Sequence, residues 1–161
     1  MILSTASHAT ELSLVALTGK QAAGMPNGVT YSSLYFPLID SAGQFAFIAE
    51  LSGSGVSSSN DSALFLGQPG AFIPVAREGD HAPGTPDGVR YSSFEGRNRF
   101  MAWNAQGQFA FPAGLSGPGI TSSNNQGIWF GENNSVSLVT RTGNLADGLS
   151  GNRRSLSSMD H

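Results

Sequence analysis

Two stretches of the chain join a polar turn signal to an apolar run, and each predicts a tight turn followed by a strand. The first reads D-S-A-G-Q-F-A-F from Asp40 to Phe47, and the second reads N-A-Q-G-Q-F-A-F from Asn104 to Phe111. An Asp or Asn at the first position of a four-residue turn bonds the backbone two residues on, and a Gly at the fourth position tolerates a positive φ. Each stretch is therefore expected to reverse the chain and feed a strand.

The strand after the first turn is apolar on both faces. Its side chains alternate between two sets, with Phe45, Phe47, Ala49 and Leu51 on one face and Ala46 and Ile48 on the other. Successive side chains of a strand point to opposite faces of the sheet. A strand with two apolar faces is expected to lie between layers.

The chain repeats itself. The run A-A-G-M-P-N-G-V-T-Y-S-S at 22–33 returns as A-P-G-T-P-D-G-V-R-Y-S-S at 82–93, and 51–60 returns at 115–124 after a four-residue gain around 95–99. A third, incomplete copy begins where 138–143 resembles 74–79. Self-similarity at a fixed period is the signature of repeat architectures. We therefore expect an N-terminal tail (1–11), a single β-repeat domain (12–158) with repeats at about 12–71 and 72–135 and a partial third at about 136–158, and a C-terminal tail (159–161).

The first repeat predicts short strands separated by regular breakers. We expect strands near 29–34, 37–39, 44–51, 63–66 and 71–76. No window shows a helical stripe, and Gly or Pro interrupts the chain at short intervals. Pro112 replaces Ile48 in the second repeat and removes a ladder donor, so that position is expected at an edge or bulge.

This pattern predicts an all-β fold. Four or five antiparallel strands in each period of about 60 residues favour tandem blades of a β-propeller-like repeat over a solenoid. The alternative is a β-sandwich built from the two repeats. Two repeats and a partial third are too few to close a ring, because propellers typically need about four to eight blades. We therefore expect a fragment or a degenerate member of a propeller class.

Composition narrows the partners. The net charge is −3, and the 8 basic residues cluster only at Arg97 with Arg99 and at Arg153 with Arg154, which argues against nucleic acid. The absence of Cys excludes a disulfide scaffold and a thiolate metal site. No apolar run approaches the length of a membrane span, and the first residues lack the basic region of a signal peptide.

The carboxylates give no catalytic pattern. Asp40 becomes Asn104 in the second repeat and Asp61 becomes Asn125, as a turn position allows but an acid, base or metal ligand does not. The cluster Glu78-Gly79-Asp80-His81 keeps only its Gly in the other copies, and the Ser-rich loops offer too few carboxylates for calcium. No nucleophile elbow, zinc pair or phosphate-binding loop is present. We expect no catalytic residue, no metal and no cofactor.

The segment 94–103, F-E-G-R-N-R-F-M-A-W, breaks the repeat and mixes aromatic residues with Arg and Asn. Such a mixture suits a groove that binds a sugar or a peptide. The candidate ligand-binding residues are Arg97, Arg99, Phe100 and Trp103. The alternative is a longer loop whose Phe100 and Trp103 enter the core.

The repeat resembles a known bacterial family, the choice-of-anchor tandem-repeat proteins described by the motif N-x-x-G-x-x-A-F. The motif is matched in full by Asn104, Gly107, Ala110 and Phe111, and with Asp for Asn by Asp40, Gly43, Ala46 and Phe47. The resemblance covers about 12–158. It implies propeller-like repeats in an exported, surface-associated protein of unassigned biochemical role. The chain departs from that pattern, since it shows neither a signal peptide nor a C-terminal anchor.

Two hypotheses of function follow, and an enzyme has no motif in its favour. The first is a non-enzymatic surface or interaction module that binds a glycan or a protein at the cell surface. The second is a carbohydrate-binding, lectin-like module in which chains associate into a homo-oligomer and complete a propeller. Open sheet edges and apolar faces invite such association, so a compact monomer is not expected.

Overall fold

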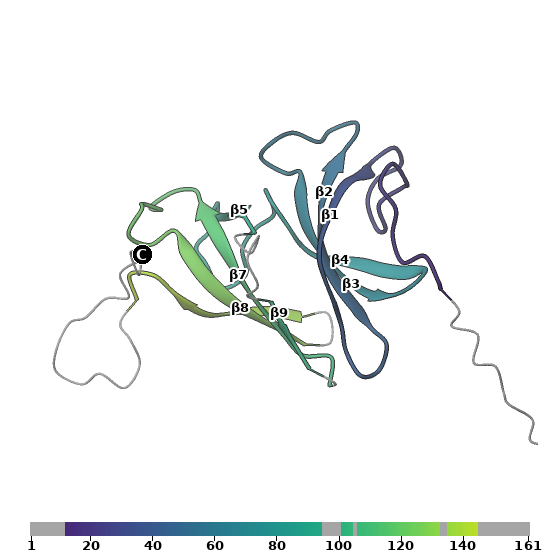
Figure 1. Ribbon diagram of the computed structural model, residues 1–161. Helices are drawn as coiled ribbons and strands as arrows, with labels where there is room; N and C mark the ends of the chain where they lie inside the picture. The colour runs from purple at the N-terminus through teal and green to yellow at the C-terminus, as the bar shows by residue number, and fades with distance from the viewer. Residues whose placement is uncertain (1–11, 95–100, 105, 133–134, 145–161) are drawn as a thin grey trace, which may run out of the picture.

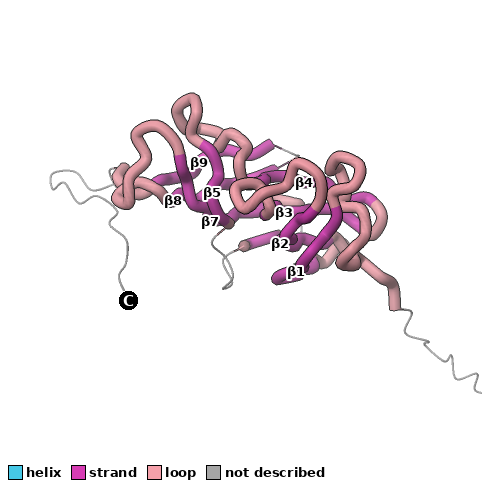
Figure 2. Tube along the Cα trace, turned by 90° about the horizontal axis from the view of Figure 1, so that it is seen from above, coloured by secondary structure: helices cyan, strands magenta, loops and turns pink. Residues whose placement is uncertain are grey.

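The computed structural model describes residues 12–94, 101–104, 106–132 and 135–144, and this part of the chain is all-β (Figure 1). It forms two antiparallel sheets and contains no helix. The predicted all-β class is confirmed. Seen from above, the two sheets lie beside one another (Figure 2).

The first sheet is a simple meander of four strands. In chain order these are β1 (Thr30–Ile39), β2 (Phe45–Ser52), β3 (Ser62–Gln68) and β4 (Ala71–Arg77), and each pairs with the next. The expected strands at 29–34 and 37–39 are one strand, β1. Its pairing with β2 shifts register between Tyr35 and Leu38, where Phe36 has a φ of 51°. A bulge of this kind lets a strand bend and then resume its pairing.

The second sheet has the same order with its first strand divided. It contains β5 (Arg90–Ser93), β6 (Ala102–Trp103), β7 (Phe109–Ser116), β8 (Gln126–Glu132) and β9 (Ser135–Arg141). The order is β5-β7-β8-β9, and β6 also pairs with β7. β5 and β6 are thus the two parts that correspond to β1.

The boundary between the two sheets does not coincide with the boundary between the two repeats defined by the sequence. β4 begins the sequence-defined second repeat yet completes the first sheet, and β9 lies in the expected partial third repeat yet completes the second sheet. The described strands therefore form two sheets without a surplus strand. Residues 145–158 of the expected third repeat lie outside the described part.

The two polar turns have the expected geometry. Asp40 Oδ1 accepts hydrogen bonds from the backbone N–H groups of Ala42 (2.8 Å) and Gln44 (2.9 Å). Asn104 Oδ1 accepts the equivalent pair from Gln106 and Gln108, both at 3.0 Å. The Gly at the fourth position of each turn has a φ of 76°, which a side chain would strain.

Two apolar clusters form the core, and β2 contributes to both. Phe47, Ala49 and Leu51 pack with Tyr31 and Phe65 in one cluster, which the segment before β1 helps to cover. The second cluster lies between the sheets. It joins Ala46, Leu64, Leu66 and Ala76 of the first sheet to Phe109, Phe111, Ala113, Leu115 and Trp129 of the second. The expected position of this strand between layers is confirmed.

Pro112 lies at an interruption in the neighbouring strand. It is opposite Ile128 on β8, but the backbone of Leu115 donates toward β8, so by alternation the nitrogen of Pro112 faces the other side. On that side β5 pairs with β7 only from Ser116 to Gly114, and β6 pairs with β7 only at Ala110 and Phe109. The missing N–H therefore falls where no described strand pairs with β7.

Candidate functional site

Equivalent faces of the two sheets differ in whether a neighbouring sheet covers them. In the first sheet one face points at the second sheet and is covered by it. This inner face consists of Ala46, Ile48, Leu64, Leu66 and Ala76. Leu64 is only 1% exposed. The face is the apolar half of the contact that holds the two sheets together.

The counterparts of these residues form the outer face of the second sheet. By sequence repetition they are Ala110, Pro112, Ile128, Phe130 and Thr140. Cross-strand pairing joins Ala110 to Phe130 and places Ile128 between Pro112 and Thr140, so the five share one side of the sheet. The alternate residues Phe111 and Trp129 point toward the first sheet. The outer face is therefore turned away from the contact between the sheets.

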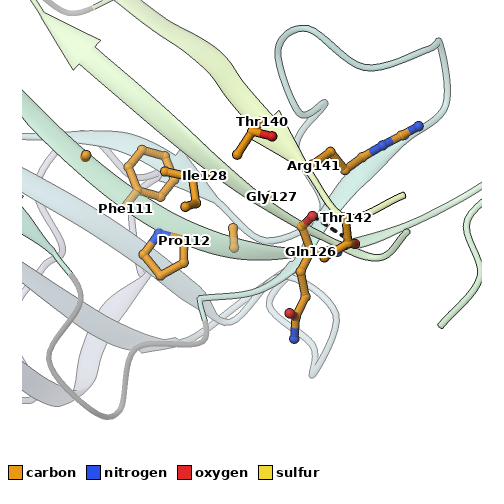
Figure 3. A pocket seen from close by; sticks show the side chains of 10 residues that line it. Phe111, Pro112, Gln126, Gly127, Ile128, Thr140, Arg141 and Thr142 are labelled. Carbon is orange, nitrogen blue, oxygen red and sulfur yellow. Dashed lines mark hydrogen bonds between the residues drawn. The ribbon is translucent and has the colours of Figure 1, made fainter. Parts of the chain in front are cut away.

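The outer face is apolar and open to solvent. Ile128 is 45% exposed. Val139 is 60% exposed, and it is the counterpart of Val75, which packs against the cluster between the sheets. A groove of about 550 Å³ runs over this face. Figure 3 shows Pro112, Ile128 and Thr140 along the groove. Clustered apolar side chains of this kind mark binding surfaces more often than single exposed residues do.

One end of the groove is polar. Gln126, Arg141 and Thr142 line it there (Figure 3). The hydroxyl of Thr142 donates to the carbonyl of Gln126 and accepts from its N–H, both at 3.2 Å. This reciprocal pair fixes the end of β8 against β9. The groove thus combines an apolar floor with a polar rim, which is the usual anatomy of a protein-binding surface.

Trp103 of the predicted ligand-binding set lies at the contact between the sheets. Its indole Nε1 donates a 2.8 Å hydrogen bond to Asp40 Oδ2, and its ring stacks on Phe109 with centroids 5.8 Å apart. The hydrogen bond from Trp103 is the main cause that lowers the pKa of Asp40, followed by the backbone N–H of Gln44. Arg97, Arg99 and Phe100 lie outside the described residues. The structure thus places one member of the predicted set, as a bridge between the sheets.

A second groove, of about 460 Å³, lies beside this bridge. Both sheets contribute to it, with Gln44, Leu66 and Ile73 from one and Trp103, Gln106 and Phe109 from the other. The motif turns therefore meet at this groove. The lining mixes aromatic rings with amide side chains, which donate and accept hydrogen bonds.

Three carboxylates converge at one end of the first sheet, and the sequence interpretation missed them as a group. Glu78 is 7% exposed, and its pKa is raised to about 7 first by burial and then by the hydrogen bond and charge of Asp61. Glu50 adds a smaller repulsion, and a backbone hydrogen bond at Ser62 opposes the rise. Asp61 therefore adds to the effect of burial in favouring the protonated form of Glu78.

The repeat carried the signal for this cluster. Glu50, Asp61 and Glu78 are replaced by Gly114, Asn125 and Thr142 in the second repeat, so all three carboxylates disappear together. The nearby His81 is not part of the group, since its ring Nδ1 lies 3.1 Å from the carbonyl oxygen of Val89. Among the described residues, no group of three His, Cys, Asp or Glu is arranged to hold a metal ion.

These features define a class, an all-β protein of two stacked antiparallel sheets with an open apolar groove on the outer face of the second sheet. The family model of a family of unknown function (DUF7453) matches residues 2–159, and the chain belongs to that family. No curated protein and no solved structure matches the chain. In the part that the structure describes, no helix is long and apolar enough to cross a membrane.

Proposed function

We propose that this protein is a non-enzymatic interaction module that binds a β-rich protein surface through the outer face of its second sheet. One observation carries the proposal. The inner face of the first sheet is buried by a neighbouring sheet, whereas the equivalent outer face of the second sheet leaves Ile128 45% exposed. The same repeat position is thus a contact in one sheet and open in the other.

The free energy available to a partner is substantial. Fully burying a Val or Ile side chain contributes about 1.5–3 kcal/mol relative to leaving it exposed. Ile128 and Val139 together with the half-buried Phe130 and Pro112 provide several such side chains on one surface. Face-to-face stacking of four-stranded meanders is also how propeller blades associate, which supports a propeller-like partner.

The resemblance to the N-x-x-G-x-x-A-F proteins supports an exported, surface-associated setting for this module. In that setting the partner is a protein present at the cell surface. The outer face offers no catalytic group, because its residues are aliphatic, aromatic or hydroxyl side chains and no acid or base lies among them.

Site-specific photo-crosslinking in the source cells tests the proposal. A photoreactive phenylalanine analogue is placed at Ile128, and at the exposed loop residue Thr121 as a control. The proposal predicts a discrete protein adduct from position 128 that position 121 does not give. Equal, weak labelling from both positions would show that no protein covers the outer face.

A second candidate, carbohydrate binding, is favoured by the groove between the sheets. Trp103 is only half-buried there, and Gln44 and Gln106 supply amides beside it. Retention on polysaccharide columns that disappears with Trp103→Ala, but survives Ile39→Ala, would support it. Retention that is absent in the unaltered chain, or unchanged by Trp103→Ala, would exclude this groove.

A further inference from the structure

We propose that the occupant of the outer face is the first sheet of a second copy of this chain, joined head to tail. The inference rests on the proposed function, because it names the partner of the same face. The contact between the two sheets within one chain serves as the template. Since the sequence repeats, each half of that contact has a counterpart elsewhere on the molecule.

The half contributed by the first sheet recurs as the outer face. The second sheet contributes the other half, which includes Phe111 and Trp129, whose counterparts Phe47 and Phe65 are buried beneath the segment before β1. Trp103 and Phe109 of the same half line the groove between the sheets together with Leu66. Their counterparts by repetition are Ile39 and Phe45 of the first sheet. Ile39 is 64% exposed and Phe45 is half-buried. We call Ile39 and Phe45 the receiving end.

The molecule therefore exposes two complementary ends rather than one surface that matches itself. The outer face stands in for the inner face, and the receiving end stands in for the Trp103 side of the contact. Such an arrangement makes a heterologous contact, in which each copy uses one end on its neighbour and keeps the other end free. Repetition of the contact builds a ring or a filament according to the rotation it imposes.

One polar feature of the template is not repeated. Within the chain, Trp103 donates to Asp40, whereas the counterpart pair across copies is Ile39 facing Asn104. The contact between copies therefore lacks the hydrogen bond between an indole and a carboxylate. It is consequently weaker than the contact within the chain, and its extent depends on concentration.

Sedimentation velocity on mixed variants of the full chain tests the proposal. Ile128→Asp blocks the outer face and Ile39→Asp blocks the receiving end, because each buries a charge in an apolar contact. Each variant alone is expected to weaken self-association at least tenfold. Mixed in equal amounts, the two are expected to form a 1:1 dimer that grows no further, because only one intact pair of ends remains.

Thr121→Asp carries the same charge on an exposed loop and is expected to associate like the unaltered chain. Both Ile39 and Ile128 are substantially exposed, so the charged variants should keep the fold, and Ile→Ser at each position gives a milder pair for comparison. The readout thus separates loss of a contact from loss of structure.

Two results would overturn the inference. One is an unaltered chain that stays monomeric over the whole accessible concentration range, and the other is a mixture that fails to dimerise although the unaltered chain associates. An adduct of a different protein at position 128 would then preserve the proposed function while removing the second copy as its partner. Absence of both association and adduct would remove both.

Discussion

Tyr31 and Tyr91 occupy equivalent positions in the two repeats but differ in what their hydroxyl groups contact. The hydroxyl of Tyr31 accepts a 3.0 Å hydrogen bond from the N–H of Ala23. In the second repeat Pro83 stands in place of Ala23 and has no N–H to donate. Among the described residues, the hydroxyl of Tyr91 is buried without a hydrogen-bond partner.

This difference predicts opposite responses to one substitution. Tyr31→Phe should lower the free energy of unfolding by about 1 kcal/mol, the usual loss for one hydrogen bond. Tyr91→Phe should be neutral or stabilising, since it removes a buried polar group that gains nothing from the fold. Urea unfolding of the two variants measures both. Equal destabilisation would contradict the assignment of the partners.

Glu78 makes stability depend on pH. Its pKa is about 7 in the folded chain against 4.5 as the ordinary value, so the fold favours the protonated form. The stabilisation is therefore complete below about pH 4.5 and is lost as the pH rises toward 7. Glu78→Gln, which stays neutral, should melt at a temperature close to that of the unaltered chain at pH 4.5 and above it at pH 8.

Thermal unfolding across this range measures the difference between the two melting curves. Asp61→Asn provides the matched variant, because the second repeat carries Asn125 at that position. It should flatten the pH dependence as well, since the charge facing Glu78 is gone. Melting temperatures that run parallel with pH for all three proteins would contradict a raised pKa of Glu78.

At the level of strands, the repeated turns and the buried central strand were predictable from the sequence. Asp40 and Asn104 at first turn positions, with Gly at the fourth, specify the reversals locally, and the alternation after Asp40 specifies two buried faces. Such features depend on near neighbours in the chain. The division of the strands between sheets depends on pairing partners far along the chain, so the phase of β4 and β9 could not be predicted.

The candidate site was less predictable than the fold. Trp103 was singled out because it breaks the repeat, and the structure places it between the sheets. The outer face escaped notice because Ile128 and Leu64 look alike in sequence, and only the stacking shows that one is covered and the other is open. The carboxylate cluster escaped because its members come from three separate strand ends.

Replacing the first residue of each turn with alanine should lower the melting temperature by different amounts. Asp40→Ala removes two backbone contacts and the acceptor for Trp103, whereas Asn104→Ala removes two equivalent backbone contacts and a bond to the side chain of Gln108. Asp40→Ala should therefore lower the melting temperature further, because it also loosens the sheet contact. A larger effect at Asn104 would contradict the bridging role of Asp40.

At the level of the whole molecule, stacking of the two sheets makes equivalent positions contribute differently to the free energy of unfolding. Leu64→Ala leaves a cavity between the sheets and should cost about 2–5 kcal/mol. Ile128→Ala, at the equivalent position of the outer face, should cost the dilute monomer less than about 1 kcal/mol. Chemical unfolding at low protein concentration checks both. Similar losses at the two positions would mean that the outer face is already covered within one chain.

Thiol labelling at the outer face shows whether a protein partner covers it. The chain has no Cys, so Ile128→Cys and the control Thr121→Cys each introduce a single reactive thiol. We expect a maleimide to label both positions equally in the dilute purified chain, but to label position 128 much more slowly than 121 in intact source cells. Equal labelling of the two positions in cells would mean that no protein covers the outer face.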